Sequence, residues 1–369
     1  MSIEISLCMI VKNEEENLRA CLESAADLAD EIIIVDTGST DRTIEIASEY
    51  TRKIFNFEWV DDFSAARNFS YSKATKDYIF WLDADDIITE PNRKKFLQLK
   101  NEMYKNSVDV VLMKYEYFRS PDNELFMQTR ERLSINDPKI RWCEHIHETL
   151  DLDVEGLSIL IADISITHTL KDLKDSSSRN FRILTDLILR NKASAREKFY
   201  YGLMLAISNK YEEAKKYLEE SIESQASLDI LRGILYLHKI YLTEEENDKA
   251  LRILADHQES LDDMSELHCA FGDYYKDLKE DYKTAITHYE KAMSCTGYTN
   301  GMPGYTNSQF YYFIPLKSLG FCQIKENRYS DALDSYRKAR VYDRKDETLK
   351  QLVNTLEKLI SATSFENSA

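Results

Sequence analysis

The stretch Asp77-Tyr-Ile-Phe-Trp-Leu-Asp-Ala-Asp-Asp86 joins an uninterrupted apolar run to a cluster of acids. The apolar run predicts a β-strand over 78–82 that is buried on both faces, as in the middle of a parallel sheet. Three carboxylates follow within four residues, at Asp83, Asp85 and Asp86. Clustered carboxylates repel one another, so at the carboxyl end of a strand they suggest a divalent cation. A solvated acidic turn is the simpler alternative.

Two common kinds of ligand-binding loop are excluded by spacing. If Asp83 is the first position of an EF-hand loop, the sixth is Ile88 rather than Gly and the twelfth is Lys94 rather than Glu. The chain also lacks the G-x-x-x-x-G-K and G-x-G-x-x-G patterns, so the ATPase and dehydrogenase classes lack their most diagnostic feature.

Composition limits the partners and the compartment. The 369 residues leave room for two or three domains, and the net charge of −17 argues against a nucleic-acid partner. No apolar run approaches the ~18 residues of a membrane helix, and the first residues resemble a strand rather than a signal peptide. The six cysteines lie far apart without a Cys-x-x-Cys pair. Reduced thiols and a cytoplasmic location are therefore expected.

The first part of the chain alternates strands and helices. Strands are predicted over 3–11, 31–36, 54–57 and 78–82, with helices between them, the second capped by Ser39 or Thr40. This order predicts an α/β fold with a mostly parallel sheet and right-handed crossovers. Asp36 and Asp83 both follow strands, and the carboxyl ends of parallel strands share one crevice.

Four blocks along this segment occur together in one known family. They are Ser6-Leu-Cys-Met-Ile-Val-Lys-Asn-Glu-Glu15, Ile34-Val-Asp-Thr-Gly-Ser-Thr-Asp-Arg-Thr43, Phe63-Ser-Ala-Ala-Arg-Asn68 and Trp81-Leu-Asp-Ala-Asp-Asp86. In this order and at this spacing they resemble family 2 glycosyltransferases of the GT-A fold, a Rossmann-like architecture. The resemblance implies a nucleotide-diphosphate-sugar donor, a divalent ion (Mn²⁺ or Mg²⁺) and inversion at the anomeric carbon.

The same resemblance implies roles for individual residues. Those expected to touch the nucleotide are Asn13, Glu14 and Asp36. Arg67 is expected near the diphosphate, Asp83 at the ribose or sugar, and Asp85 on the ion.

Each of these roles has a structural alternative. Asp36 could cap the following helix, and Glu14 belongs to an acidic run that could be a solvated turn. Arg67 could form an ion pair with Asp61 or Asp62.

Further along, Ile146-His147-Glu148 resembles a Val-His-Glu block of family 2 enzymes that carry helical repeats. An inverting transfer needs one base, for which Glu148 is the choice and His147 the competitor. Successive strand residues point to opposite faces, so we expect any strand here to end at this pair. His168 follows a strand predicted over 164–168, where the resemblance implies a further ion ligand. The next pair, 169–170, departs from the Gly-aromatic pair that family members usually carry.

The composition changes after residue 170. A polar hinge is predicted over 171–180 and an amphipathic helix over 181–190. Small residues then recur at steps of twelve and seven, as at Gly320, Ala332 and Ala339, which is typical of tetratricopeptide repeats. The predicted domains are a glycosyltransferase domain over 1–170, a linker helix over 171–194, an all-α tetratricopeptide-repeat superhelix over 195–361 and a frayed tail over 362–369.

This combination resembles the bacterial peptide glycosyltransferases, including the S-glycosyltransferases that modify glycocin peptides on cysteine. It predicts a metal-dependent inverting enzyme that uses a UDP-sugar, UDP-glucose or UDP-GlcNAc by family habit. The expected acceptor is a Ser, Thr or Cys of a polypeptide held partly by the repeats, which could also form a homodimer. One alternative is a saccharide or lipid-linked acceptor, although no membrane segment supports a lipid. Another is a non-catalytic repeat scaffold.

Overall fold

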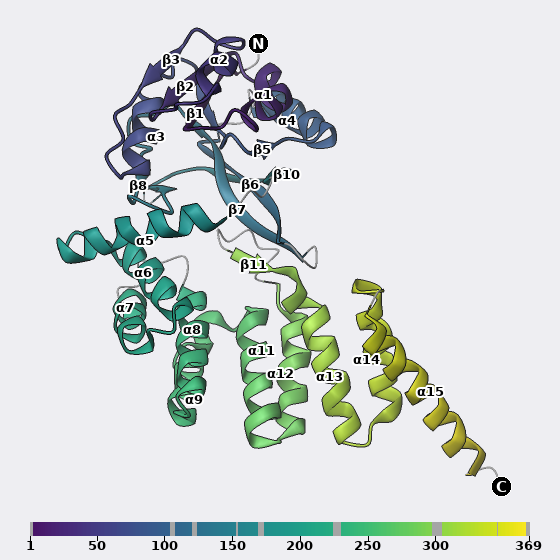
Figure 1. Ribbon diagram of the computed structural model, residues 1–369. Coiled ribbons are helices and arrows are strands. Elements are labelled where there is room, and N and C mark those ends of the chain that lie inside the picture. The colour runs from purple at the N-terminus through teal and green to yellow at the C-terminus, as the bar shows by residue number, and fades with distance from the viewer. Residues whose placement is uncertain are drawn as a thin grey trace. The chain divides into compact units, whose positions relative to one another are not determined.

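The computed structural model describes residues 3–103, 108–119, 124–152, 154–168, 173–223, 230–296, 305–344 and 346–366. The chain forms two compact units (Figure 1). The first comprises Met1–Leu205 with the short segments Glu223–Leu228 and Pro303–Tyr305. The second comprises Ala206–Ile222, Asp229–Met302 and Thr306–Ala369. The first unit thus extends beyond residue 170, where the glycosyltransferase domain is expected to end.

The first unit is an α/β domain. Its elements are β1 (Ile5–Val11), α1 (Leu18–Ala25), η1 (Ala26–Leu28), β2 (Glu31–Asp36), α2 (Thr43–Ser48), β3 (Ile54–Asn56), α3 (Phe63–Tyr71), β4 (Tyr78–Trp81), β5 (Asp86–Ile87), α4 (Glu90–Met103), β6 (Val110–Arg119), β7 (Glu124–Ile135), β8 (Trp142–Cys143), β9 (Thr149–Leu150), β10 (Ile159–His168), α5 (Leu173–Leu189) and α6 (Ala195–Ile207).

The main sheet has the order β3-β2-β1-β4-β7-β6-β10-β5. The pairings β3–β2, β2–β1 and β1–β4 are parallel, as is β6–β10, whereas β7 is antiparallel to both of its neighbours on this path. The expected α/β class with a mostly parallel sheet is therefore confirmed. Because β2 and β4 flank β1 in parallel, the acids that follow β2 and β4 emerge at the same edge of the sheet.

The central strands are buried on both faces. On one face, Leu7 of β1 and Phe80 of β4 pack with α1 and α4 through Leu22 and Phe96. On the other face, residues of the alternate register pack with α3, among them Trp81 and Tyr71. Residues 78–82 are all less than 9% exposed, which confirms the prediction from the apolar run.

Two local predictions differ from the structure. The helix after β2 begins at Thr43, because the Asp41 carboxylate accepts hydrogen bonds from Thr43, while the hydroxyl of Ser39 accepts from Asn13 instead of capping the helix. The polar hinge predicted over 171–180 is wrong for 173–180, which form the start of α5. Residues 169–172 lie outside the described residues.

The second unit consists of helices. These are α7 (Tyr211–Glu223), α8 (Ile230–Thr243), α9 (Asn247–Ala255), α10 (Gln258–Leu261), α11 (Ser265–Tyr274), η2 (Tyr275–Lys279), α12 (Tyr282–Ser294), η3 (Ser308–Tyr311), α13 (Phe313–Lys325), α14 (Tyr329–Tyr342) and α15 (Glu347–Glu366), with β11 (Tyr305–Asn307) between α12 and η3. Successive helices pack as antiparallel pairs, as the repeat prediction requires (Figure 1). Helix α15 continues to Glu366, within the predicted tail over 362–369.

Small residues allow these helices to approach closely. The predicted positions Ala332 and Ala339 are completely buried, and Gly320 faces the ring of Tyr336 on α14.

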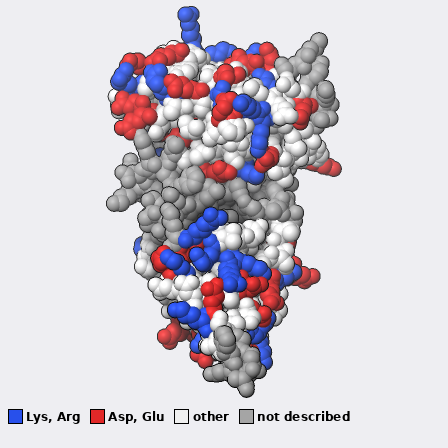
Figure 2. All heavy atoms as spheres, turned by 90° about the vertical axis from the view of Figure 1, so that its right-hand side faces the viewer, with Lys and Arg blue, Asp and Glu red and all other residues white. Residues whose placement is uncertain are grey.

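Acidic and basic side chains are interspersed on the face of the molecule shown in Figure 2.

Candidate active site

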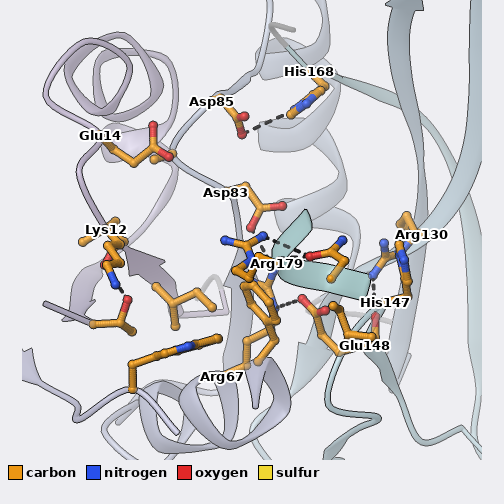
Figure 3. A pocket seen from close by; sticks show the side chains of 18 residues that line it. Lys12, Glu14, Arg67, Asp83, Asp85, Arg130, His147, Glu148, His168 and Arg179 are labelled. Carbon is orange, nitrogen blue, oxygen red and sulfur yellow. Dashed lines mark hydrogen bonds and ion pairs between the residues drawn. The ribbon is translucent and has the colours of Figure 1, made fainter. Parts of the chain in front are cut away.

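A cleft of about 370 Å³ lies at the carboxyl edge of β1 and β4 (Figure 3). Several polypeptide segments supply its walls, namely the ends of both strands, α3, the loop after β8, the end of β10 and α5. Its lining residues are Ile10, Val11, Lys12, Glu14, Thr37, Trp59, Phe63, Arg67, Asp83, Ala84, Asp85, Arg130, Ile146, His147, Glu148, His168, Arg179 and Asn180.

Three potential metal ligands meet beside this cleft. One ligand atom from each of Asp85, Asp86 and His168 lies within 4.8 Å of the others. The pairing of β10 with β5 brings them together, because His168 stands opposite Asp86 in the antiparallel register. His168 Nδ1 lies 3.3 Å from Asp85 Oδ1 and 3.7 Å from Asp86 Oδ1 (Figure 3). Two carboxylates and an imidazole at this spacing suit a divalent ion such as Mn²⁺.

Asp86 is fully buried and has one oxygen left for a further partner. Its Oδ2 accepts hydrogen bonds from the Asp83 amide at 2.9 Å and from Arg132 Nη1 at 2.8 Å. Within the described part of the chain, Oδ1 has no hydrogen-bond partner. A buried carboxylate oxygen without a hydrogen bond is costly, and only His168 Nδ1 lies near it, at 3.7 Å, among the described residues, so this position favours a cation.

The charges around the candidate ion site are strongly coupled. Burial raises the pKa of Asp85, against the effect of the neighbouring His168. Burial lowers the pKa of His168, but the carboxylates of Asp85 and Asp86 outweigh it and raise the pKa to about 10. These shifts describe the group without a metal, where the protonated imidazole is the available positive charge beside Asp85.

Arg67 joins two of the predicted site residues (Figure 3). Its Nη2 lies 2.8 Å from Asp83 Oδ1 and its Nε lies 2.7 Å from Glu148 Oε1. The guanidinium carbon also lies 4.4 Å and 4.8 Å from the ring centroids of Trp81 and Trp142. The alternative pairing of Arg67 with Asp61 or Asp62 is therefore wrong.

This pairing stabilises the ionised forms of the buried Arg67 and the partly exposed Asp83. Burial raises the pKa of Asp83, but Arg67 and Arg132 outweigh it and lower the pKa to about 2. Burial opposes the charge of Arg67, but Asp83 and Glu148 outweigh it and raise its pKa. The acids expected to pair with Arg67 are used elsewhere: Asp61 binds Arg182, and Asp62 caps α3.

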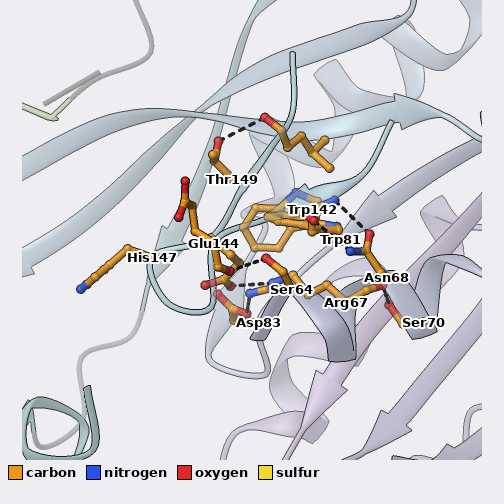
Figure 4. Close-up of polar contacts among 12 residues, drawn as sticks. Ser64, Arg67, Asn68, Ser70, Trp81, Asp83, Trp142, Glu144, His147 and Thr149 are labelled. Atoms are coloured by element: carbon orange, nitrogen blue, oxygen red, sulfur yellow. Dashed lines mark hydrogen bonds and ion pairs between the residues drawn. The ribbon is translucent and has the colours of Figure 1, made fainter. Parts of the chain in front are cut away.

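The loop after β8 carries the two candidate bases. The strand ends at Cys143, earlier than expected, and Glu144 and His147 have φ angles of 72° and 55°. Glu148 faces Arg67, and its backbone oxygen accepts a hydrogen bond from Arg130 Nη2 at 3.0 Å. The His147 side chain projects away from Arg67 and Asp83 in Figure 4. Its ring stacks on that of Tyr200, with 3.7 Å between the ring centroids. Both residues line the cleft.

The three predicted nucleotide-binding residues differ in whether they line the cleft. Glu14 lines the cleft, whereas Asn13 and Asp36 do not. Asn13 Oδ1 accepts a hydrogen bond from the Thr40 amide at 2.8 Å. Asp36 is 6% exposed and accepts from the amides of Gly38 and Ser39, which shapes the turn rather than capping α2. Their side chains therefore fix the loops that border the cleft.

Sequence reasoning missed several residues of the cleft. Lys12 and Phe63 lay inside the recognised blocks without an assigned role, and Asp86 was noted only as part of the acidic cluster. Arg130, Trp59, Arg179 and Asn180 come from segments without a pattern of their own. Only the basic Thr129-Arg-Glu-Arg132 segment before a strand end offered a weak signal.

Residues 6–155 match the family model described as Glycosyl transferase family 2. The chain therefore contains a family 2 glycosyltransferase domain, and its sheet with the acidic cluster after β4 is GT-A-like. A long helical region follows this domain.

Two curated relatives are similar to part of this chain and are longer than it. A TPR repeat-containing protein of Synechococcus elongatus is 38% identical over 149 residues, which are 40% of this chain and 36% of the relative. The SPbeta prophage-derived glycosyltransferase SunS of Bacillus subtilis is 28% identical over 228 residues, which are 60% of this chain and 53% of the relative. The chain spans about half or less of the length of these relatives.

Solved structures with partial similarity include Staphylococcus aureus TarS in complex with UDP-GlcNAc. The match has a TM-score of 0.41 at 14% identity and covers 80% of this chain and 93% of that chain. Glucosyl-3-phosphoglycerate synthase from Mycobacterium tuberculosis, in complex with Mn²⁺ and UDP-glucose, gives a TM-score of 0.34 at 14% identity, covering 50% and 78%. Among the described helices of the present chain, none has the length and apolar character needed to span a bilayer.

Proposed function

We propose that this protein is a metal-dependent inverting glycosyltransferase that moves a sugar from a UDP-sugar to a Ser, Thr or Cys side chain of a polypeptide. The observation that carries the proposal is the convergence of Asp83, Asp85, His168 and Glu148 on one cleft at the carboxyl edge of the sheet. Open α/β sheets bind their ligands at this edge. The family 2 domain supplies the reaction class.

The residues present fit a divalent ion. Asp85, Asp86 and His168 would hold it, since their ligand atoms lie close together and the buried Asp86 Oδ1 has no hydrogen-bond partner among the described residues. Bound there, Mn²⁺ or Mg²⁺ would neutralise charge on the diphosphate of the donor. Lys12 and Arg179 also line the cleft and offer positive charge to the same phosphates.

The base of the proposed transfer is Glu148. The acceptor oxygen or sulfur forms a bond to the anomeric carbon as the bond to the diphosphate breaks, and the acceptor proton passes to the Glu148 carboxylate. Arg67 fixes this carboxylate through Oε1, so the orientation of the other oxygen is defined before substrate arrives. His147 is the competing candidate, and its stacking on Tyr200 holds its ring in a separate position.

The proposal of a polypeptide acceptor is based on the helical repeats and on the resemblance to bacterial peptide glycosyltransferases. Stacked helix pairs form extended surfaces that bind peptides or a second copy of the chain. The part of the chain similar to SunS extends over 228 residues, more than the family 2 domain alone. UDP-glucose and UDP-GlcNAc are the donors to try first.

The test is to incubate the protein with Mn²⁺ and a panel of UDP-sugars, with and without Ser-, Thr- or Cys-containing peptides, and to measure released UDP. Asp85→Ala should abolish release, while Asp163→Asn, which removes an exposed carboxylate elsewhere on the domain, should not. Full activity of Asp85→Ala would refute the metal assignment. Absence of any UDP binding would favour the scaffold alternative.

A further inference from the structure

We infer that α6, the first helix of the predicted repeat region, is a working part of the active site, with Glu197 as the positioning residue for the loop 144–148. This inference rests on the proposed function, because that loop carries His147 and Glu148. All residues involved belong to the first compact unit. A set of contacts joins the start of α6 to three of the five loop residues, namely Glu144, His145 and His147.

The start of α6 has the form of a capping box. Ser194 precedes the helix, and Glu197 is its third residue. The Ser194 Oγ accepts a hydrogen bond from the Glu197 amide at 3.1 Å, and Glu197 Oε2 accepts one from the Ser194 amide at 2.9 Å. Two amides at the helix start are therefore satisfied by each other's side chains. This arrangement fixes the Glu197 carboxylate in space.

The second oxygen of the same carboxylate holds the loop. Glu197 Oε1 accepts a hydrogen bond from the His145 amide at 2.7 Å and lies 2.9 Å from His145 Nδ1. Glu197 is 1% exposed, so water does not readily replace it as a partner. A capping box alone needs only one carboxylate oxygen, which leaves the contacts to His145 as an additional function of this side chain.

Other residues at the start of α6 contact Glu144 and His147. The Ser194 hydroxyl donates to the Glu144 carboxylate, and Arg196 Nε donates to the His147 backbone oxygen at 3.3 Å. The ring of Tyr200 stacks on that of His147. Helix α3 also contacts the loop, through a hydrogen bond from the Phe63 amide to the His145 oxygen at 2.8 Å.

The loop needs this support because its backbone is strained. Glu144 and His147 both have left-handed φ angles, which are unfavourable for a residue other than Gly. Such conformations persist only where the surrounding structure imposes them. Glu148 follows His147 directly, so the contacts from α6 help to place its backbone, while Arg67 holds its carboxylate. A change in the position of α6 therefore changes catalysis without touching the donor residues.

The experiment compares Glu197→Ala and Glu197→Gln with Asp281→Ala in the full-length protein. Asp281 caps α12 in the second unit by accepting from the Thr284 amide, so its loss removes a helix cap far along the chain from the loop. Glu197→Gln keeps the shape of the side chain but supplies only one oxygen. Amide hydrogen exchange across 143–149, UDP affinity and steady-state kinetics are measured for each variant.

We expect Glu197→Ala to increase exchange across 143–149 at least about tenfold and to lower kcat about 10–100-fold, with KM for the donor and Kd for UDP nearly unchanged. Glu197→Gln should show the same pattern to a smaller degree, and Asp281→Ala should show neither change. Exchange and kcat close to wild type in folded Glu197→Gln and Glu197→Ala would overturn the inference, as would equal losses in Asp281→Ala. If the wild-type protein transfers no sugar, the proposed function fails, while the exchange measurement still decides the positioning role.

Discussion

The Nη1 atom of Arg132 lies 2.8 Å from Oδ2 of Asp86, and neither side chain is exposed to solvent. The guanidinium also lies over the rings of Trp81 and Tyr115, at 3.9 Å and 4.3 Å from their centroids. This pair sets the orientation of Asp86, so that its other oxygen stands beside His168. The ion pair therefore belongs to the architecture of the candidate metal site.

Replacing Arg132 should strongly destabilise the fold. Arg132→Met leaves the Asp86 carboxylate buried without its partner, which we expect to lower the free energy of unfolding by about 3–5 kcal/mol. Urea unfolding followed by circular dichroism measures this change. Arg337→Met is the matched control, since its ion pair with Glu357 is exposed and should contribute less than about 1 kcal/mol. Equal effects of the two substitutions would contradict the role of the buried pair.

A second buried carboxylate gives a pH-dependent prediction. Burial raises the pKa of Glu31, but hydrogen bonds from Lys53, Ser6 and Thr75 outweigh it and lower the pKa from 4.5 to about 2. Because the folded-state pKa lies below the unfolded value, this stabilisation is present above about pH 4.5 and is lost as the pH falls towards 2. Glu31→Gln should therefore lower the free energy of unfolding by about 2–3 kcal/mol at pH 7.

The difference between wild type and Glu31→Gln should shrink steadily as the pH is lowered from 5 to about 2. Thermal unfolding at a series of pH values provides the measurement. A difference that stays constant over this range would show that these contacts do not stabilise the ionised form of Glu31.

The assignment of the base leads to a comparison of two substitutions. Glu148→Gln should lower kcat by about 10²–10⁴, since a carboxamide cannot accept the acceptor proton, while UDP affinity in the presence of Mn²⁺ stays similar. His147→Gln should have a smaller effect, because its ring stacks on Tyr200 rather than facing Arg67. If His147→Gln were the more damaging change, the base would be His147 instead.

The helical repeats predict the effect of a single methyl group. A Cβ atom at Gly320 would lie 2.8 Å from ring carbons of Tyr336 on the paired helix. Gly320→Ala should therefore destabilise the protein by about 1–3 kcal/mol, although alanine is the better helix former. Urea unfolding of this variant, alone and combined with Tyr336→Ala, measures the clash. A more stable Gly320→Ala protein would contradict the close packing of α13 on α14.

Much of the sheet could be predicted from local sequence. The apolar run over 78–82 and its acidic end define a buried strand and its carboxyl edge without reference to any other segment. The meeting of Asp85 with His168 followed from the resemblance, and the register of β10 against β5 supplies its physical basis. Patterns of this kind work because the period and burial of a strand are local properties.

The partners of the buried charges could not be predicted in the same way. Arg67 binds Glu148 from 81 positions away, and Glu197 reaches His145 across 52 positions. These contacts depend on how α3, the loop 144–148 and α6 pack together. The spacing of apolar residues along the sequence does not predict this packing. The predicted hinge over 171–180 is wrong for 173–180 because a polar composition does not by itself prevent a helix.

The most direct test of the candidate metal and donor site is anomalous X-ray diffraction from crystals of this protein soaked with Mn²⁺ and UDP. We expect a manganese peak at roughly 2.0–2.6 Å from Asp85, Asp86 and His168, with the UDP diphosphate beside it in the cleft. Ordered UDP in another part of the molecule, or manganese bound away from these three residues, would contradict it.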